Sequence, residues 1–176
     1  MTTKYVVAVF LIFVLASCKP APQETTTSAS AETPVKITAC QLMTDPAAYD
    51  HKLVEVSGDV SVGFEDFAIY AHDECAARNM IWLDLGGSAD PGTMYCCGDH
   101  RRDVPLMVEG VMTPLVDDAK TRRFVKVVQT GHAGGPSTLI GHFFSGKPSR
   151  LPDRTIWGGY GHMGCCSLLV IQQVLD

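Results

Sequence analysis

One stretch, KLVEVSGDVSV from Lys52 to Val62, constrains the fold of this chain more than any other feature of its sequence. Its positions form two alternating sets, namely Val54, Val56 and Val60 against Leu53, Glu55, Ser57 and Asp59. Although the alternation is only partly clean, a period of two predicts a β-strand with one buried face. Gly58 lies in the middle, and a glycine inside a strand marks a bulge or a sharp bend. Because a bent strand can serve both halves of a closed sheet, the stretch favours a small barrel.

Further strands are expected at short apolar stretches bounded by glycine and other turn residues. They lie at 36–38, 67–71, 80–85, 104–112, 124–128 and 167–175. A short helical segment is expected at 39–49, where Pro46 suits a first helical position. Residues 129–166 are rich in glycine, and their pattern predicts no particular element. The basic residues around Arg122 and Arg123 are expected at the solvated edge of a hairpin.

These elements predict one mainly β domain, a small closed or partly open barrel with a short N-terminal helical segment. The phrase DPAAYDHKLVEVSGDVSV, from Asp45 to Val62, resembles the opening of OB-fold-like domains in uncharacterised bacterial envelope proteins. The resemblance covers about residues 36–115 and implies an OB-like barrel. A different β-sandwich or β-barrel stays open as the alternative.

The N-terminus indicates an exported protein. Lys4 is followed by an apolar run from Tyr5 to Leu15 and then by the small residues Ala16 and Ser17. A charged start, a short apolar run and small residues are typical of a secretory signal. The run is too short for a transmembrane helix, which takes roughly twenty residues. Residues 1–17 are therefore expected to be a signal peptide.

Leu15-Ala16-Ser17-Cys18 resembles the lipobox of bacterial lipoproteins. The resemblance implies cleavage before Cys18, acylation of its thiol and new amino group with chains such as palmitate, and a stable membrane anchor. Lys19 stands where many lipoproteins of the inner membrane carry aspartate, which favours the outer membrane, with the domain facing the periplasm. The alternative is an ordinary cleaved signal followed by an incidental cysteine.

Residues 18–35 are expected to be the lipidated cysteine and a flexible tether, because Pro, Ser, Thr, Ala and Glu dominate there and cannot form a core. Residues 36–176 then form a single β-barrel domain. The whole chain has 14 basic and 19 acidic side chains, and removing the signal removes Lys4, so the mature net charge is 13 − 19 = −6. This charge argues against a nucleic-acid partner, since affinity for nucleic acid rests on Lys and Arg.

Six cysteines remain beyond Cys18, and they are candidates for disulfides: Cys40, Cys75, Cys96, Cys97, Cys165 and Cys166. An oxidising envelope favours disulfide bonds. Adjacent cysteines rarely bond to each other, because their Cα atoms lie 3.8 Å apart and a disulfide usually needs roughly 4.4–6.8 Å. Each of the two Cys-Cys doublets is therefore expected to find partners elsewhere, with the other doublet the first candidate.

The same doublets carry a second hypothesis. Cys97 and His100, and likewise His162 and Cys165, are separated by two residues, which is the spacing of structural zinc clips. Together they predict an alternative Cys₂His₂ site for Zn or Cu; the main prediction is no cofactor. A redox dithiol is disfavoured because no C-x-x-C is present.

No catalytic motif is convincing. Gly159–Gly164 matches G-x-G-x-x-G, the pattern of a dinucleotide-binding turn. That turn needs a helix after the glycines and an acidic residue about twenty positions later. Here an apolar strand pattern follows the glycines, and the printed sequence ends at Asp176. Gly141–Lys147 resembles a Walker A loop, but Pro148 takes the place of Ser or Thr. We therefore expect a membrane-anchored, non-catalytic binding or scaffolding module for a protein, glycan or small molecule. The other hypotheses are a metal-binding envelope protein and an enzyme with an unrecognised motif.

Overall fold

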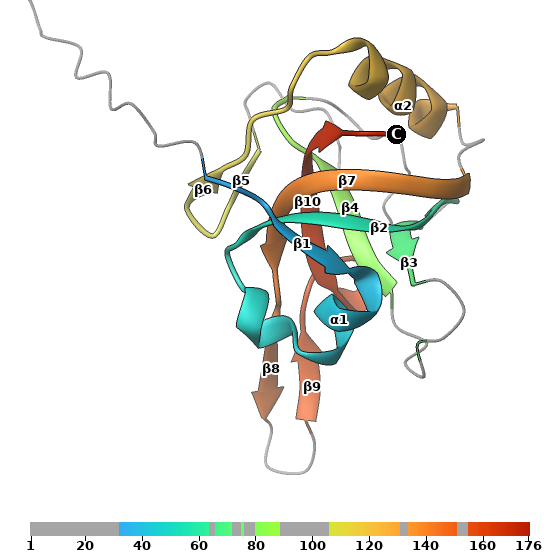
Figure 1. The fold of residues 1–176 in the computed structure, drawn as a ribbon. Helices are drawn as coiled ribbons and strands as arrows, with labels where there is room; N and C mark the ends of the chain where they lie inside the picture. Colours follow the sequence, from blue (N-terminus) through green and yellow to red (C-terminus); the bar gives the residue numbers. More distant parts are fainter. Residues whose placement is uncertain are drawn as a thin grey trace, which may run out of the picture. The chain divides into compact units, whose positions relative to one another are not determined.

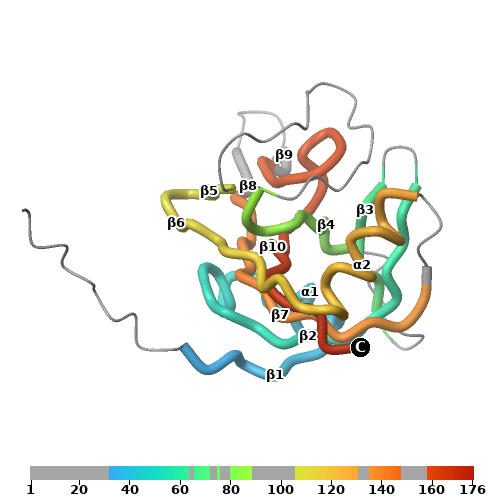
Figure 2. The backbone as a smooth tube through the Cα atoms, turned by 90° about the horizontal axis from the view of Figure 1, so that it is seen from above, coloured from blue at the N-terminus to red at the C-terminus, as the bar shows by residue number. Residues whose placement is uncertain are grey.

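The computed structural model describes residues 32–63, 66–71, 75, 80–88, 106–130, 134–150 and 155–176. Five strands close into a barrel: β2 (Leu53–Val62), β3 (Phe67–Tyr70), β4 (Met80–Leu85), β10 (Ser167–Val174) and β7 (Gly134–Phe144). They follow each other in this order, and β7 pairs back with β2 to complete the ring (Figures 1 and 2). Only the β4–β10 pairing within the ring is parallel. The predicted OB-like barrel is confirmed.

Gly58 in β2 is the point where this strand changes partners. The residues before it pair with β1 (Val35–Thr38), and the residues after it pair with β3. The other edge of β2 pairs with β7 along almost its whole length. A Cβ atom at Gly58 would lie only 2.5 Å from the backbone oxygen of Tyr70 and 2.8 Å from Ile69. The absence of a side chain therefore permits the close approach of β3 that closes the ring.

The remaining elements surround the barrel. They are α1 (Ala39–Thr44), η1 (Pro46–Tyr49), the hairpin β5 (Met107–Val108) and β6 (Val111–Met112), α2 (Ala119–Gln129), the hairpin β8 (Lys147–Arg150) and β9 (Thr155–Gly158), and η2 (His162–Gly164). The expected helical segment at 39–49 is present as α1 and η1. Thr38 begins α1 with a capping box, in which its hydroxyl accepts the Gln41 N–H and the Gln41 side chain accepts the Thr38 N–H.

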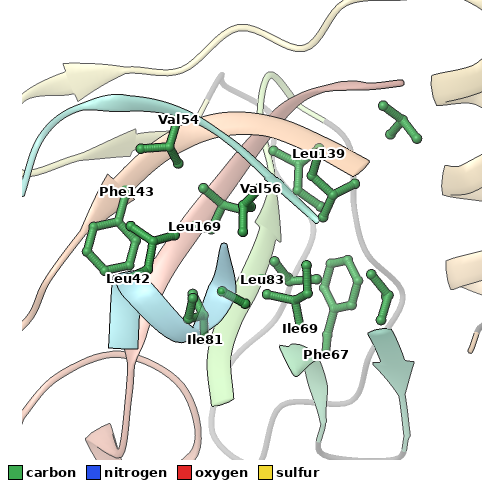
Figure 3. Packing of buried hydrophobic residues seen from close by; sticks show 14 of the residues in the cluster. Leu42, Val54, Val56, Phe67, Ile69, Ile81, Leu83, Leu139, Phe143 and Leu169 are labelled. Carbon is green, nitrogen blue, oxygen red and sulfur yellow. The ribbon is translucent and has the colours of Figure 1, made fainter. Parts of the chain in front are cut away.

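The core fills the inside of the barrel with aliphatic and aromatic side chains (Figure 3). Alternate residues of the five strands point inward, as the pleat of a strand requires. Examples are Val54, Val56, Phe67, Ile69, Ile81, Leu83, Leu139, Phe143 and Leu169. Leu42 of α1 and Val128 of α2 join the same cluster, so both helices are held by their apolar faces.

The strand expected at 124–128 is wrong, because these residues belong to α2. The Asp118 side chain accepts a hydrogen bond from the Thr121 N–H at 2.8 Å and so caps the helix. The residues that pack inward are Thr121, Phe124, Val125 and Val128, at helical spacing. This apolar stripe outweighs the strand preference of the β-branched residues. The basic residues near Arg122 therefore lie on a helix and not on a hairpin edge.

Two other expectations change. Within the predicted strand 104–112, the described residues form the β5–β6 hairpin, with Glu109 and Gly110 at the turn. Their φ angles are 46° and 82°, as a tight two-residue hairpin turn requires. Residues 129–166, which had no predicted element, contain β7, the longest strand. Its polar and glycine-rich first half hides the strand pattern.

A second apolar cluster lies on the outer face of β4, β10 and β7. It contains Trp82, Phe144, Cys166, Leu168 and Val170, with Leu106, Val108, Val111 and Tyr160 packed against them. The β5–β6 hairpin and the chain around η2 therefore cover this face. Among the described residues, no helix has the length and apolarity needed to cross a bilayer.

The closure at Gly58 leads to a stability prediction. Gly58→Ala is expected to lower the free energy of unfolding by about 1–3 kcal/mol, because the new Cβ meets backbone that can move only if β3 moves. Gly63→Ala is the matched control, since its Cβ would meet Asp66 at an ordinary 3.5 Å. Urea unfolding of both variants measures the difference. Equal stability of the two variants would contradict the role given to Gly58.

Candidate functional site

A pocket of about 540 Å³ lies between α2 and the segment that leads into it. One wall is a stripe of α2, and the other is the linker before the helix together with the end of β4. The lining residues are Gly87, Ser88, Leu115, Val116, Asp117, Thr121, Arg122, Val125, Lys126 and Gln129. The volume is within the usual range for small-molecule sites, roughly 300–1,000 Å³.

Backbone hydrogen bonds fix the linker wall of this pocket. The Gly87 N–H donates to Thr113 O at 2.7 Å, and the Val116 N–H donates to Gln172 O at 2.7 Å. Gly86 makes this packing possible, because a Cβ there would lie 2.6 Å from Pro114 O and 2.8 Å from Ile171 O. The linker is thus attached to the ends of two barrel strands, and the pocket has a rigid base.

The Thr121 hydroxyl is the unusual group of the pocket. The residue is only 1% exposed, and its Oγ1 has no hydrogen-bond partner. Its backbone N–H is used by the Asp118 cap, so the hydroxyl itself contributes nothing to the helix start. A buried polar atom without a partner costs roughly 1–3 kcal/mol.

Charged side chains lie at the rim. Arg122 donates through Nη1 to Asp117, at 2.8 Å to Oδ1 and 3.1 Å to the backbone oxygen. Lys126 lies one helical turn further along, on the same side of α2. Apolar surface from Leu115, Val116 and Val125 lies between these charges and the linker. The site therefore combines a polar rim with an apolar wall.

A separate polar cluster joins the β5–β6 hairpin to the barrel. Glu109 at the tip of the hairpin accepts the Tyr160 hydroxyl at 2.6 Å and lies 3.0 Å from His51 Nε2. On the other side of the ring, His51 Nδ1 lies 3.2 Å from Asp50. The ring also packs edge-on against Phe144, with centroids 5.2 Å apart. We call Asp50, His51, Glu109 and Tyr160 the latch.

Two residues of the latch have strained backbone angles, and two have shifted pKa values. His51 and Glu109 have φ angles of 59° and 46°, a region that is costly for residues other than glycine. Partial burial, together with the hydrogen bond to Glu109, raises the pKa of Tyr160 well above its ordinary value, so the phenol stays a donor. Burial acts to raise the pKa of Asp50, but hydrogen bonds from Ser145 and the neighbouring His51 lower it overall. The cluster therefore stabilises one position of the hairpin.

The pocket and the latch are two distinct sites. In Figures 1 and 2 the β5–β6 hairpin and α2 lie at different sides of the barrel. The pocket is lined by α2 and residues 115–117, whereas the latch unites the β2 entry, the hairpin and Tyr160. The sequence analysis identified neither site.

The structure describes four of the six candidate disulfide cysteines. Cys40 and Cys75 bond to each other, with Cα atoms 5.5 Å apart, and join α1 to the β3–β4 connection. Cys165 bonds to its neighbour Cys166. This differs from the expectation that both would bond elsewhere. Gly161, Met163 and Gly164, all with positive φ, turn the chain sharply before β10, and Cys166 is buried just ahead of that strand. Cys96 and Cys97 lie outside the described residues.

The predicted metal site is only partly described. Cys97 and His100 lie outside the described residues, as does the lipidation candidate Cys18. His162 begins η2, and Cys165 is bonded to Cys166, so its sulfur is not the thiolate that binds a metal. Among the described residues, no group of three or more His, Cys, Asp or Glu side chains is arranged to hold a metal ion. The Zn or Cu site stays a prediction that requires a reduced Cys165.

Some of the missed residues had a readable signal. Asp118 is an N-cap residue type directly before the helical pattern, and the inward positions from Thr121 to Val128 have helical spacing. Recognising them would have placed Arg122 and Lys126 on one helix face. The latch had no such signal, because its residues come from segments far apart in the sequence.

Comparison of this chain with protein-family models, curated proteins and solved structures finds no match. The site must therefore be interpreted from its own geometry.

The latch leads to a pH prediction. Asp50→Asn is expected to lower the free energy of unfolding at pH 7 by about 1 kcal/mol, because it removes the carboxylate that Ser145 and His51 contact. The folded-state pKa of Asp50 lies below its ordinary value of 3.8. Its stabilisation is therefore complete well above pH 4 and is lost as pH falls through the folded-state pKa.

Urea unfolding of the natural protein and of Asp50→Asn between pH 7 and pH 3 measures this effect. The stability difference between them should shrink towards the acid end, because protonation of the carboxyl group removes the charge that stabilises the folded chain. A difference that stays constant over this range would show that Asp50 acts through packing and not through its charge.

Proposed function

We propose that this protein is a lipid-anchored binding module of the bacterial cell envelope, and that the pocket beside α2 holds its ligand, a small molecule. The proposal joins two sources of support. The lipobox-like Leu15–Cys18 and the tether support the anchor, and the geometry of the described domain supports binding. The partner at the anchor is the membrane, on the proposed outer-membrane side that faces the periplasm.

The single observation that carries the binding proposal is a pocket of ligand size that combines an apolar wall with charged groups at its rim. Ligand sites are mostly apolar concavities with a few polar groups that fix the ligand's orientation. Here the apolar wall comes from Leu115, Val116 and Val125, and the charged groups are Arg122 and Lys126. The arrangement suits a ligand that has both apolar and polar parts.

The scaffold supports this role because it does not depend on the ligand for its own shape. The linker wall is bonded to the β4 and β10 ends, and α2 is attached by its buried residues Thr121 and Val128. Sites on rigid elements hold their groups in position better than sites on free loops. The pocket is therefore preorganised, which reduces the entropy lost on binding.

The proposed tether would set the distance between the domain and the membrane surface. Because Glu32 contacts Leu53 and β1 begins at Val35, the proposed tether comprises about thirteen residues, 19–31, and a flexible chain of this length has an end-to-end distance of roughly 18–22 Å. A domain held at this distance clears the lipid headgroups and can sample ligands in the periplasm. Two or more acyl chains on Cys18 would make the attachment stable, whereas a single chain binds reversibly.

The anchor is tested with Cys18→Ala. We expect this variant to lose labelling by radioactive palmitate in cells and to move from the membrane fraction to the soluble fraction or to accumulate unprocessed. Ser17→Ala is the control, because it keeps a small residue before Cys18 and should stay labelled. Palmitate labelling that survives in Cys18→Ala would disprove the proposed lipidation site.

The binding site is tested with Val116→Trp. Val116 is 43% exposed on the pocket wall, so an indole there fills the pocket without entering the core. We expect a panel of small organic acids, alcohols and amines to contain compounds that raise the unfolding temperature of the natural protein but not of this variant. Val127→Trp is the control, because Val127 is 38% exposed on α2 and does not line the pocket. Compounds that stabilise all three proteins equally would contradict the site.

A further inference from the structure

We propose that the pocket beside α2 selects a small organic carboxylate with an apolar body. This inference rests on the proposed function, since it names the ligand class of the same pocket. It is carried by the placement of two cations and an apolar wall around one cavity.

The two cations are arranged for one anionic group. Arg122 and Lys126 are four residues apart on α2, a spacing that puts both side chains on the same side of a helix. Among the described residues, no carboxylate lies within ion-pair distance of Lys126. Arg122 contacts Asp117 through Nη1 only, and a guanidinium has five N–H groups in a fork. Both cations therefore have donors left for a ligand carboxylate.

The net formal charge of the residues that line the pocket has the opposite sign to the net charge of the whole chain. The lining has two cations and one carboxylate, Asp117, so its formal charge is 2 − 1 = +1. The whole chain is −5. A net acidic protein repels anions in general, so a locally positive pocket gives selectivity to this place. A cationic ligand would meet Arg122 and Lys126 and find only Asp117, which is already paired with Arg122.

The other groups of the pocket account for the rest of the ligand. Val116 is exposed in the wall next to Leu115 and Val125, and an apolar ligand body would remove these side chains from water. The carboxylate of such a ligand would lie at the rim, where it accepts from Arg122 and Lys126.

The test compares phenylacetate with phenylacetamide, which has the same shape and no charge. The purified full chain is held in lipid nanodiscs, and ligand-observed saturation-transfer NMR titrations use empty nanodiscs as background. We expect phenylacetate to bind at least about threefold more tightly than phenylacetamide, as a charge-assisted contact with two partly exposed cations allows. Raising the salt concentration should reduce this preference.

Variants locate the effect. Lys126→Glu should abolish the preference for the carboxylate, because it replaces one of the two cations at the rim with an anion. Arg123→Glu is the matched control, because Arg123 is an exposed neighbour on α2 that does not line the pocket. This variant should still prefer phenylacetate to phenylacetamide. Circular dichroism and thermal unfolding of each variant establish that it is folded.

The outcomes separate this inference from the proposed function. If phenylacetamide binds as tightly as phenylacetate and Val116→Trp blocks both, the pocket binds small molecules but the carboxylate class is wrong. If Arg123→Glu loses the preference as fully as Lys126→Glu, general electrostatics explain it and the inference fails. If neither probe binds the natural protein at millimolar concentration, the carboxylate inference is overturned, while the panel with Val116→Trp still decides the binding role.

Discussion

The closure of the sheet on itself through β2 is the constraint on which the rest of the structure depends. Along one edge β2 pairs with β1 and then with β3, and along the other edge it pairs with β7. This one strand therefore joins the two ends of the sheet and closes the barrel. The switch falls at Gly58, where a side chain would collide with β3. Within the part of the chain that the structure describes, the closed ring leaves no long barrel strand with an unpaired edge. Helices α1 and α2 lie outside its hydrogen-bonded frame, where they can carry function.

The two polar sites show how this frame is used. The latch stabilises the β5–β6 hairpin over the second apolar cluster, and its strained residues His51 and Glu109 are held by contacts with each other. The pocket instead uses the link between β4, the segment before α2 and β10. A glycine serves each site in a different way: Gly110 permits the positive φ of the hairpin turn, and Gly86 permits the close approach of backbone at the pocket base. The barrel itself supplies rigidity and no ligand group.

The sequence predicts the barrel well because the relevant signal is local. The alternation and the central glycine of β2 can be recognised within eleven residues, and the bend at Gly58 follows from them. Helix α2 was not predicted because FVKVV consists mostly of residues that favour strands. The helical spacing of its inward residues becomes recognisable only when Asp118 is taken as the helix cap. The latch could not be predicted, since it depends on the register that brings Glu109 to His51 and Tyr160. The bond between Cys165 and Cys166 also depends on tertiary context, namely the positive φ angles that precede it.

Thr121 is the residue at which folding and function pull in different directions. Its backbone serves the helix start, and valine would fill nearly the same space without an orphaned hydroxyl. A sequence that is consistent at every level avoids such a group, and violations are expected mainly at functional sites. The residue lines a pocket that also has two cations and an exposed apolar wall. Because the Oγ1 atom itself is enclosed, a ligand could accept its hydrogen bond only after the side chain rotated towards the pocket, and the free energy spent on the unpaired hydroxyl would then be recovered.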